Sequence, residues 1–412
     1  MNLTKPKKEN KMLKKLISCL ILACCLFAFT ACNANVTIKS PESQVKSSQT
    51  ILTSSLEKST TKSVSTEKST AKSVSTEKSA TKSSQTKSSS KPSTSTSLTT
   101  AQKNIITKAT NVIDWQLENG GWGKNYDTTT TFTSYPSDYC WKVNNKFVGT
   151  IDNEATYTEM RLLAEAYTIN GDSKFKASFD KGMAFLKNLQ YSTGGFAQIY
   201  PHNGKYNDYV TFNDDAMVSV LEMLSDIAQN KEPFKTIVCD SERNSCKQML
   251  DKAVEYILKA QITIGGKKTA WCAQHDPENY KPMKARSYEL ASVSGSESVG
   301  IIKFLKTQTD NEEALQAAET ARLWLKERRL ENTAYSKKSA PNSFTTSQGN
   351  YVWYRFYNLE TGKGYFCTRS GKVYYDFAEF CVADKEENGG SYDRATGYDW
   401  AGSWLQKAGL NY

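Results

Sequence analysis

The chain has 412 residues, 38% of them hydrophobic and 23% charged, and it carries a formal net charge of +10. Residues 1–100 account for this charge, because they hold 16 of the 53 basic residues and 5 of the 43 acidic ones, which leaves the rest of the chain at −1. A folded part without net positive charge argues against a nucleic-acid-binding protein.

The first 32 residues have the composition of a lipoprotein signal peptide. Six lysines between Lys5 and Lys15 precede an apolar run over 16–29, which is too short for a comfortable bilayer span. The run ends in Phe29-Thr30-Ala31-Cys32, which resembles the bacterial lipobox. We therefore expect an exported protein with a lipid anchor at Cys32 on the cell surface. Plain secretion after cleavage near Ala31 is the alternative.

Residues 33–100 are rich in Ser, Thr and Lys and repeat a ten-residue unit that starts at Glu57, Glu67 and Glu77. Such a segment buries too little apolar surface to offset its ordering entropy, so we predict a disordered tether. Its positive charge suits contact with anionic wall polymer or lipid headgroups. Residues 101–412 remain, enough for one large domain, which we expect to be a monomer.

Helical periodicity dominates the chain after residue 100. Apolar residues recur at three- and four-residue spacing in seven stretches, each of which predicts a helix. These are Ile105–Leu117, Ala155–Ile169, Phe175–Leu189, Ala216–Ile227, Met249–Ile262, Val299–Leu305 and Ala314–Leu325.

A repeat constrains the fold further. Gln116, Gln190 and Gln261 each follow a predicted helix, and a Gly-Gly pair comes four residues later at 120–121, 194–195 and 265–266. The intervals leave room for two helices and their loops, and glycine suits the left-handed stop of a helix. We predict a mainly α fold, an α/α toroid or incomplete α/α barrel of helical hairpins. Its Gly-Gly turns would gather at one end, beside a binding cleft.

The last third, from about Tyr335, departs from this pattern. Tyr351–Tyr357 and Lys372–Tyr375 are aromatic runs that predict short β segments. We expect this part to wrap the helical hairpins and to contribute to the cleft.

Six of the ten cysteines lie outside the signal: Cys140, Cys239, Cys246, Cys272, Cys367 and Cys381. Export makes disulfides possible, and the pairs close in sequence, Cys239/Cys246 and Cys367/Cys381, are the plausible ones. Structural thiols are the alternative. None of the six has the clustered spacing of a zinc site.

Acidic residues open two of the predicted helices, in Thr150-Ile-Asp152-Asn-Glu154 and Thr211-Phe-Asn213-Asp214-Asp215. On spacing alone helix capping is the favoured explanation, because Thr211 and Asp214 have the spacing of a capping box. The functional alternative brings carboxylates from both helix starts to one rim, where their hard oxygen atoms suit calcium. For Glu297 in Ser294-Gly-Ser-Glu297, which repeats the spacing, we prefer capping.

Arginines lie among aromatic residues in three other segments, as Arg286, Arg355 and Arg369. Several guanidinium groups of this kind suggest planar recognition of carboxylates, and aromatic rings suit sugar faces. A polyuronic acid combines both features. His275 lacks an accompanying nucleophile motif, so we expect a structural or supporting role for it rather than general-base catalysis.

The segments that carry these residues together resemble the family 10 pectate lyases and occur in the family's order over nearly all of 101–412. The matching strings begin with Thr150-Ile-Asp-Asn-Glu-Ala-Thr-Tyr-Thr-Glu-Met160, Gly194-Gly-Phe-Ala-Gln-Ile-Tyr-Pro201, Thr211-Phe-Asn-Asp-Asp-Ala-Met217 and Trp271-Cys-Ala-Gln-His-Asp276. They continue with Ser294-Gly-Ser-Glu-Ser-Val-Gly300, Trp353-Tyr-Arg-Phe-Tyr357, Phe366-Cys-Thr-Arg-Ser-Gly371 and Gly397-Tyr-Asp-Trp400.

The resemblance implies an α/α toroid that cleaves polygalacturonate by calcium-assisted β-elimination, leaving 4,5-unsaturated oligogalacturonides. It implies that Arg369 is the base, that Asp152 and Asp214 bind Ca²⁺ with the adjacent Asp215 as a candidate third ligand, and that Arg286 and Arg355 clamp substrate carboxylates. The chain departs from the family's usual proline at Ala197 and near Gly364.

An arginine base requires a neutral guanidine, which nearby positive charge and desolvation favour, so we expect an alkaline pH optimum. Two other functions remain open on the sequence. One is a glycoside hydrolase on a related toroid, which needs two carboxylates and no metal. The other is a non-catalytic lipoprotein that binds oligouronides.

Overall fold

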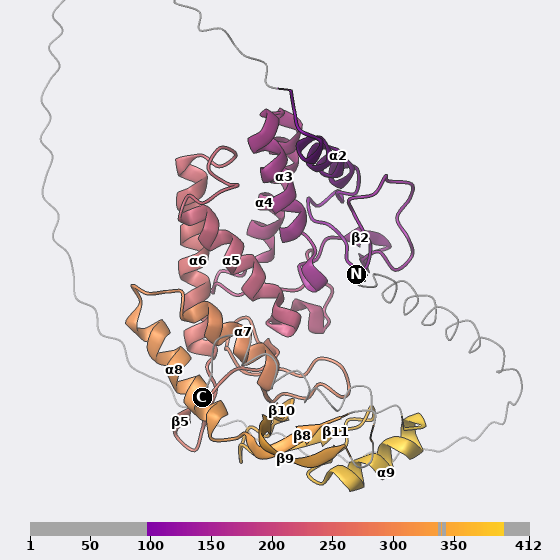
Figure 1. The fold of residues 1–412 in the computed structure, drawn as a ribbon, viewed down its shortest axis with the longest axis vertical. Coiled ribbons are helices and arrows are strands. Elements are labelled where there is room, and N and C mark those ends of the chain that lie inside the picture. The colour runs from indigo at the N-terminus through magenta and orange to yellow at the C-terminus, as the bar shows by residue number, and fades with distance from the viewer. Residues whose placement is uncertain (1–96, 337–338, 340–342, 391–412) are drawn as a thin grey trace, which may run out of the picture. The chain divides into compact units, whose positions relative to one another are not determined.

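The computed structural model describes residues 97–336, 339 and 343–390. The predicted signal, the lipobox at Cys32, most of the tether and the Gly397–Trp400 motif lie outside them. The described part is mainly helical (Figure 1). Its α-helices are α2 (Thr100–Asp114), α3 (Tyr157–Asn170), α4 (Ser173–Leu189), α5 (Ala216–Ala228), α6 (Asp240–Ala260), α7 (Gly295–Leu305), α8 (Glu312–Lys326) and α9 (Phe377–Asn388).

The seven predicted helices are confirmed as α2 to α8, with one large difference in their bounds. Helix α6 begins at Asp240, nine residues before the predicted start at Met249. The added turns are polar: Cys239 is the N-cap, and the Glu242 side chain accepts from the Cys239 backbone N–H at 2.8 Å. An apolar period does not reveal such a start, because capping and exposed charge stabilise it rather than burial.

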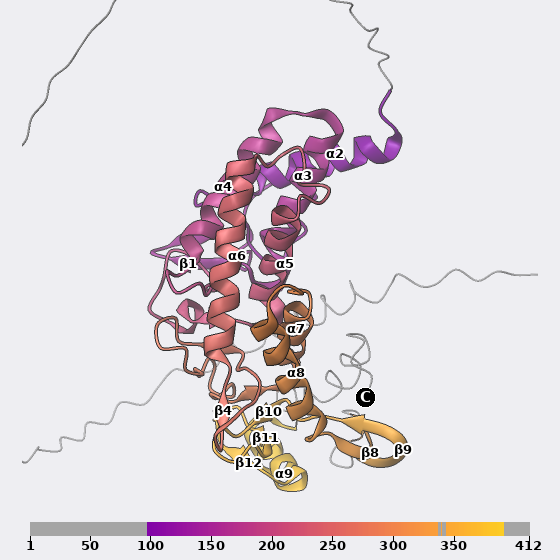
Figure 2. The same ribbon diagram turned by 90° about the vertical axis from the view of Figure 1, so that its left-hand side faces the viewer.

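The helices pack in consecutive pairs, α3 with α4, α5 with α6 and α7 with α8. One helix of each pair also contacts its counterpart in the next pair, so that α3, α5 and α7 form one row (Figures 1 and 2). The predicted helical hairpins are therefore present in the described residues. Their closure into a ring stays a prediction.

The repeated glutamines link the helices of a second row, α2, α4, α6 and α8. Gln116, after α2, donates through Nε2 to Gly120 O in its own turn (2.8 Å) and to Ser178 O in α4 (2.9 Å). Gln190, after α4, donates in the same way to Gly194 O (2.9 Å) and to Met249 O in α6 (2.8 Å). Each side chain thus ties its turn to the neighbouring hairpin.

The third glutamine keeps the link but not the turn. Gln261, after α6, donates to Thr269 O and to Ala317 O in α8, both at 3.0 Å. Its glycines, Gly265 and Gly266, form the two-residue turn of a small hairpin between β4 (Thr263–Ile264) and β5 (Lys267–Lys268), with no other described residue packed against them. In the first copy, by contrast, a Cβ on Gly120 would lie 2.3 Å from Lys181 O, so close packing requires the glycine there.

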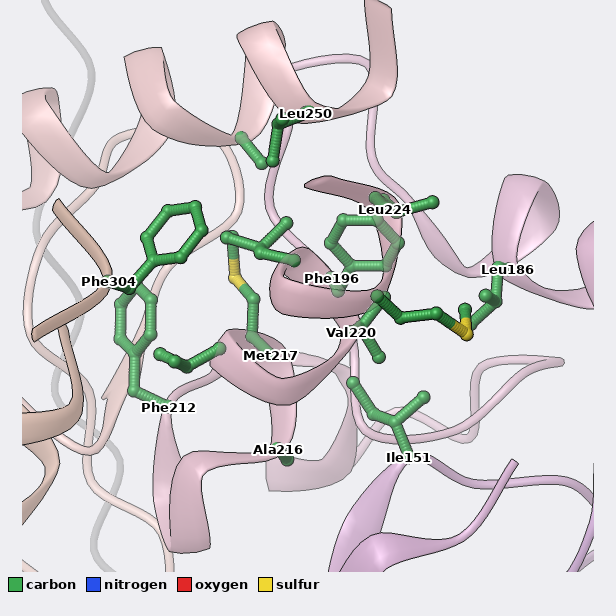
Figure 3. Packing of buried hydrophobic residues seen from close by; sticks show 14 of the residues in the cluster. Ile151, Leu186, Phe196, Phe212, Ala216, Met217, Val220, Leu224, Leu250 and Phe304 are labelled. Carbon is green, nitrogen blue, oxygen red and sulfur yellow. The ribbon is translucent and has the colours of Figure 1, made fainter. Parts of the chain in front are cut away.

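Helix α5 passes through the middle of the hydrophobic core. Met217, Val220 and Leu224 on this helix are fully buried. Figure 3 shows Met217 beside Phe212 and Phe304, and Leu224 on the side of Phe196 and Leu186. This packing fixes the N-terminus of α5, where the acidic segment 213–215 lies.

The strands of the described part are short and mostly paired in twos. The pairs are β1 (Trp141–Val143) with β2 (Lys146–Val148), β3 (Val210–Thr211) with β6 (Gln274–His275), β4 with β5, and β8 (Leu330–Tyr335) with β9 (Phe344–Val352). A four-stranded antiparallel sheet has the order β12 (Val373–Tyr374), β11 (Gly364–Cys367), β10 (Phe356–Tyr357) and β7 (Val293–Ser294). This sheet joins the last third to the start of α7, as Figure 1 shows.

The six cysteines after residue 100 are free thiols, so neither proposed disulfide pair is present. Cys239 is the N-cap of α6, and Cys246 lies about two turns further along that helix. Cys367 lies on β11 and Cys381 on α9. Among the helices that the structure describes, none is long and apolar enough to cross a membrane.

Candidate functional site

Two short 3₁₀ turns shape the acidic helix starts. Turn η2 (Asp152–Glu154) precedes α3, and turn η4 (Asn213–Asp215) leads directly into α5. Asn153, Asp214 and Asp215 have φ values of 52°, 53° and 58°, in the left-handed region that residues other than glycine rarely adopt. Such strained backbone gathers at functional sites, and here it turns the acidic side chains away from ordinary capping positions.

The capping interpretation of Thr211 and Asp214 is wrong. The N-cap of α5 is Asp215, and it makes no side-chain capping hydrogen bond. Thr211 Oγ1 has no hydrogen-bond partner among the described residues. Spacing alone suggested a capping box, but the extra 3₁₀ turn displaces both residues from the positions that such a box needs.

A cavity of about 290 Å³ lies between these turns and the loop before α7. It is lined almost wholly by polar and charged groups. The lining residues are Lys124, Asn125, Trp141, Asp152, Asn153, Gln198, Tyr206, Asn213, Asp214, Gln274, Arg286 and Glu289. The cavity brings together three of the predicted site residues, Asp152, Asp214 and Arg286; Asp215, Arg355 and Arg369 do not line it.

Asp152 is buried, and one of its two carboxylate oxygens has a partner. Oδ2 accepts from the Lys124 ammonium, which also lies 4.9 Å from the centre of the Trp141 ring. Oδ1 is buried and has no hydrogen-bond partner among the described residues. A buried carboxylate oxygen left in this way is a ready ligand for a cation.

Asp214 lies close enough to Asp152 for their charges to interact. Burial raises the pKa of Asp214, and the negative charges of Glu297 and Asp152 raise it further. Asn213 Nδ2 donates to Asp214 Oδ2 at 2.7 Å, which orients the carboxylate. A cation between the two acids would relieve their repulsion.

The donor set fits a hard cation only in part. No group of three or more His, Cys, Asp or Glu side chains within residues 97–336, 339 and 343–390 is arranged to hold a metal ion. The lining includes the carboxylates of Asp152 and Asp214, that of Glu289, which pairs with two arginines, and the side-chain amides of Asn153, Gln198 and Gln274. Calcium takes about 6–8 oxygen ligands, so water and substrate oxygens would have to complete this set.

Asp215 points away from the cavity, towards α7. A Cβ on Gly300 would lie 2.0 Å from Asp215 Oδ1, so this glycine makes room for the carboxylate. Burial raises the pKa of Asp215 to about 7, with the charges of Glu297, Glu222 and Asp214 adding to the effect. The structure thus separates Asp215 from the pair formed by Asp152 and Asp214.

Glu297 is a buried acid rather than a helix cap. Ser294 is the N-cap residue of α7 but makes no side-chain capping bond. Glu297 Oε2 instead accepts from the hydroxyls of Ser294 and Ser296. The preferred capping interpretation of Glu297 is therefore wrong, because the carboxylate turns inward towards Asp214 and Asp215.

Arg286 and Arg355 both pair with Glu289. Arg286 Nε donates to Glu289 Oε2 at 2.6 Å, and its Nη2 donates to Oε1, so the pair is bidentate. Arg355 Nη2 lies 3.5 Å from the same Oε1. Desolvation lowers the pKa of Arg286, but the bonds to Glu289 outweigh this and hold it above its usual range. The two predicted clamps are thus brought together by a buried acid.

Arg369 is exposed and lies at the edge of this group. Its guanidinium carbon is 5.7 Å from the centre of the Tyr288 ring, and that of Arg286 is 5.3 Å from the same ring. Ser287 Oγ donates to the Arg369 backbone carbonyl. Both guanidinium groups therefore lie near the Tyr288 ring. Because Arg369 is exposed, bound polymer rather than protein burial would have to desolvate it.

Several cavity residues were not anticipated from the sequence. Lys124 follows the first Gly-Gly-Trp turn and Trp141 lies on β1, while Tyr206 belongs to the turn η3 (Tyr206–Asp208). Glu289 follows Arg286 by three residues. The Gly-Gly repeat was a signal for Lys124, because the turn that it predicts places the next residues at the same end of the helices. Isolated polar residues in loops carry no periodicity.

The structural role expected for His275 agrees with its surroundings. The ring is fully buried, Nε2 accepts from the Cys272 backbone N–H at 2.9 Å, and Nδ1 lies 2.8 Å from Tyr280 O. Burial lowers the pKa of His275 to about 4. The imidazole is engaged at both nitrogens and holds the β6 loop.

Comparisons with known proteins identify the family of the chain. The family model of pectic acid lyase matches residues 116–408. A mutant of a family 10 polysaccharide lyase from Cellvibrio cellulosa, in complex with trigalacturonic acid, is 38% identical with a TM-score of 0.62, covering 75% of this chain and 96% of that one. A second structure of the family 10 lyase from the same organism is 38% identical with a TM-score of 0.61, covering 76% and 96%. Among curated proteins none matches.

The match spans most of the chain and nearly all of both solved structures. The chain therefore belongs to the pectic acid lyase family and is a polysaccharide lyase.

Proposed function

We propose that the chain is a calcium-dependent pectate lyase that cleaves polygalacturonate by β-elimination and releases 4,5-unsaturated oligogalacturonides. The observation that carries the proposal is the cavity that the carboxylates of Asp152 and Asp214 line together with the cations of Lys124 and Arg286. A uronate polymer needs both kinds of group, cations for its carboxylates and acids for a bridging metal. The trigalacturonic acid bound to the Cellvibrio lyase supports the substrate class.

Asp152 and Asp214 are the residues that would hold Ca²⁺, and the ion would stabilise negative charge that develops on a substrate carboxylate. The two acids are held in place by Lys124 and Asn213. Asp215, proposed at first as a third ligand, would act through the charge it places behind Asp214.

Arg286 and Arg355 are the proposed clamps on substrate carboxylates. Glu289 fixes the Nε and Nη2 edge of Arg286, which leaves its remaining edge for a carboxylate oxygen. Ordered guanidinium groups stabilise an enolate-like charge without having to reorganise during the reaction.

The base that removes the C-5 proton has two candidates. The family resemblance assigns it to Arg369, and we keep this as the first proposal. Arg286 is the second, because it lines the cavity together with Asp152 and Asp214 and Arg369 does not. Replacing each by lysine separates them: the base variant loses turnover while trigalacturonate binding survives, whereas a clamp variant loses affinity as well.

The family membership decides against the glycoside hydrolase and the non-catalytic binding protein. For the architecture we propose an incomplete α/α barrel, supported by the row of helices that Gln116, Gln190 and Gln261 link. For the N-terminus we propose export, a lipid anchor at Cys32 and a flexible tether, which would present a monomeric enzyme at the cell surface.

A time course of ultraviolet absorbance on polygalacturonate tests the proposal. Unsaturated uronide should accumulate with calcium present and stop when a chelator is added, with an optimum at alkaline pH. Saturated products, or activity that survives the chelator, would contradict it.

A further inference from the structure

A second cavity, of about 320 Å³, lies in the last third of the chain and shares no lining residue with the first. Its lining residues are Arg328, Tyr354, Tyr357, Gly362, Lys363, Gly364 and Tyr375. The set combines two cations with three tyrosines and contains no acid. A site of this size is at the low end of the range for small ligands, roughly 300–1,000 Å³.

The guanidinium of Arg328 is held rigidly at this cavity. It stacks on the Trp324 ring at 3.9 Å, Nη1 donates to Trp324 O at 3.1 Å, and Nε donates to Gly362 O at 3.3 Å. Its one acidic neighbour, Glu327, is largely exposed and lies 3.4 Å from Nη1. Nη2 has no hydrogen-bond partner within the described residues, so a preorganised donor is left for an anionic group.

Aromatic surface lies beside this donor. Tyr375 is 51% exposed, which places it among the most exposed large hydrophobic residues of the part that the structure describes. A Cβ on Gly364 would lie 2.1 Å from the Tyr354 ring, so only glycine lets that ring lie flat against β11. Gly364 is close to the position at which the sequence departs from the family's usual proline.

Lys363 adds a second cation beside the rings. Its side chain is exposed and forms no ion pair with any residue in 97–336, 339 or 343–390. Two cations that line one cavity with tyrosine side chains match a sugar ring that carries a carboxylate, because guanidinium binds the carboxylate and an aromatic ring covers the apolar sugar face. Neutral sugars would leave both cations unused.

We propose that this cavity is a second binding site for uronate units of pectate, separate from the site of cleavage. It would hold a distant part of the same long polymer and so raise the effective concentration of substrate at the first cavity. The identity of the polymer rests on the proposed function; the cavity and its charge do not.

The test uses the full chain in gels that contain polygalacturonate, and compares Lys363→Gln/Tyr375→Ala with the matched variant Lys247→Gln/Leu323→Ala. The matched variant removes the same charge and one exposed hydrophobic side chain elsewhere, at residues that are 63% and 45% exposed. We expect the first variant to bind the polymer about three- to tenfold more weakly, with trigalacturonate turnover unchanged. Arg328→Gln should have the same effect if it folds, as judged by its thermal unfolding.

Equal retardation of both double variants would overturn the site. Equal retardation of the wild type by polyglutamate would overturn the uronate class and leave only attraction between charges. Failure of the proposed function has a different signature: no unsaturated product from trigalacturonate with any variant, while the gel comparison still reports on the second cavity.

Discussion

Glu289 holds Arg286 in a two-point ion pair, with Arg286 Nε 2.6 Å from Glu289 Oε2 and Nη2 bonded to Oε1. Glu289 is 4% exposed, and the Arg286 side chain is 36% exposed. The buried acid therefore orients a partly exposed guanidinium at the edge of the cavity. Arg355 Nη2 lies 3.5 Å from the same oxygen. The negative charge of Glu289 therefore offsets part of the positive charge of both arginines.

Replacing Glu289 by glutamine should reduce kcat/KM on polygalacturonate by about tenfold, because Arg286 keeps its charge but loses its fixed orientation. Initial rates of absorbance increase measure this. Glu319→Gln is the matched control, since Glu319 makes the same bidentate i,i+3 pair with Arg322 on the surface of α8. An equal loss of activity in both variants would mean that Glu289 acts only on stability.

Asp152→Asn or Asp214→Asn should weaken calcium binding by at least tenfold, because each change removes one of the two cavity carboxylates that we propose as ligands of the ion. Terbium luminescence sensitised by Trp141, together with calorimetry, measures this without activity. Asp215→Asn is the control, since Asp215 points to Gly300 instead. A loss with Asp215→Asn as large as the other two would place Asp215 among the ligands.

His275 should make the enzyme acid-sensitive. Its pKa is lowered to about 4 by burial, whereas in the unfolded chain it is near its usual value of about 6.5. The unfolded state therefore binds more protons between these values, so stability falls as pH drops from about 6.5 to about 4 and the effect is absent above that window. The full effect is on the order of 3 kcal/mol.

Urea unfolding at several pH values from 7 to 4 measures this contribution. His275→Gln should be less stable than the wild type at pH 7, since two buried hydrogen bonds change, but should show a shallower decline over the window. Parallel slopes for the two proteins would exclude His275 as the source.

Replacing Gln190 by alanine should lower the free energy of unfolding by about 1–3 kcal/mol, because it leaves Gly194 O and Met249 O without their shared donor. Denaturant unfolding checks this. The control is Gln316→Ala, whose side chain bonds Thr320 on the exposed face of α8 and should change stability by less than about 0.5 kcal/mol. A negligible effect at Gln190 would contradict its role as a link between hairpins.

The sequence determined the elements with a periodic signal. Apolar spacing located α2 to α8, since each must bury one face, and the glutamine and glycine repeat indicated hairpins of similar size. It located Asp152, Asp214 and Arg286 through a resemblance carried by ordered motifs. It failed at helix starts, because capping boxes and strained 3₁₀ turns share the same residue types, as at Thr211 and Glu297.

Tertiary structure alone decided which charges meet. Asp214 and Asp215 are adjacent in sequence, yet left-handed backbone at both positions sends one carboxylate to the cavity and the other to Gly300. Lys124 acquires its role from Asp152, and Glu289 acquires its second partner, Arg355, only through folding, because both partners are distant in sequence. Electrostatic interaction depends on distance and burial, which a local pattern of residues does not encode.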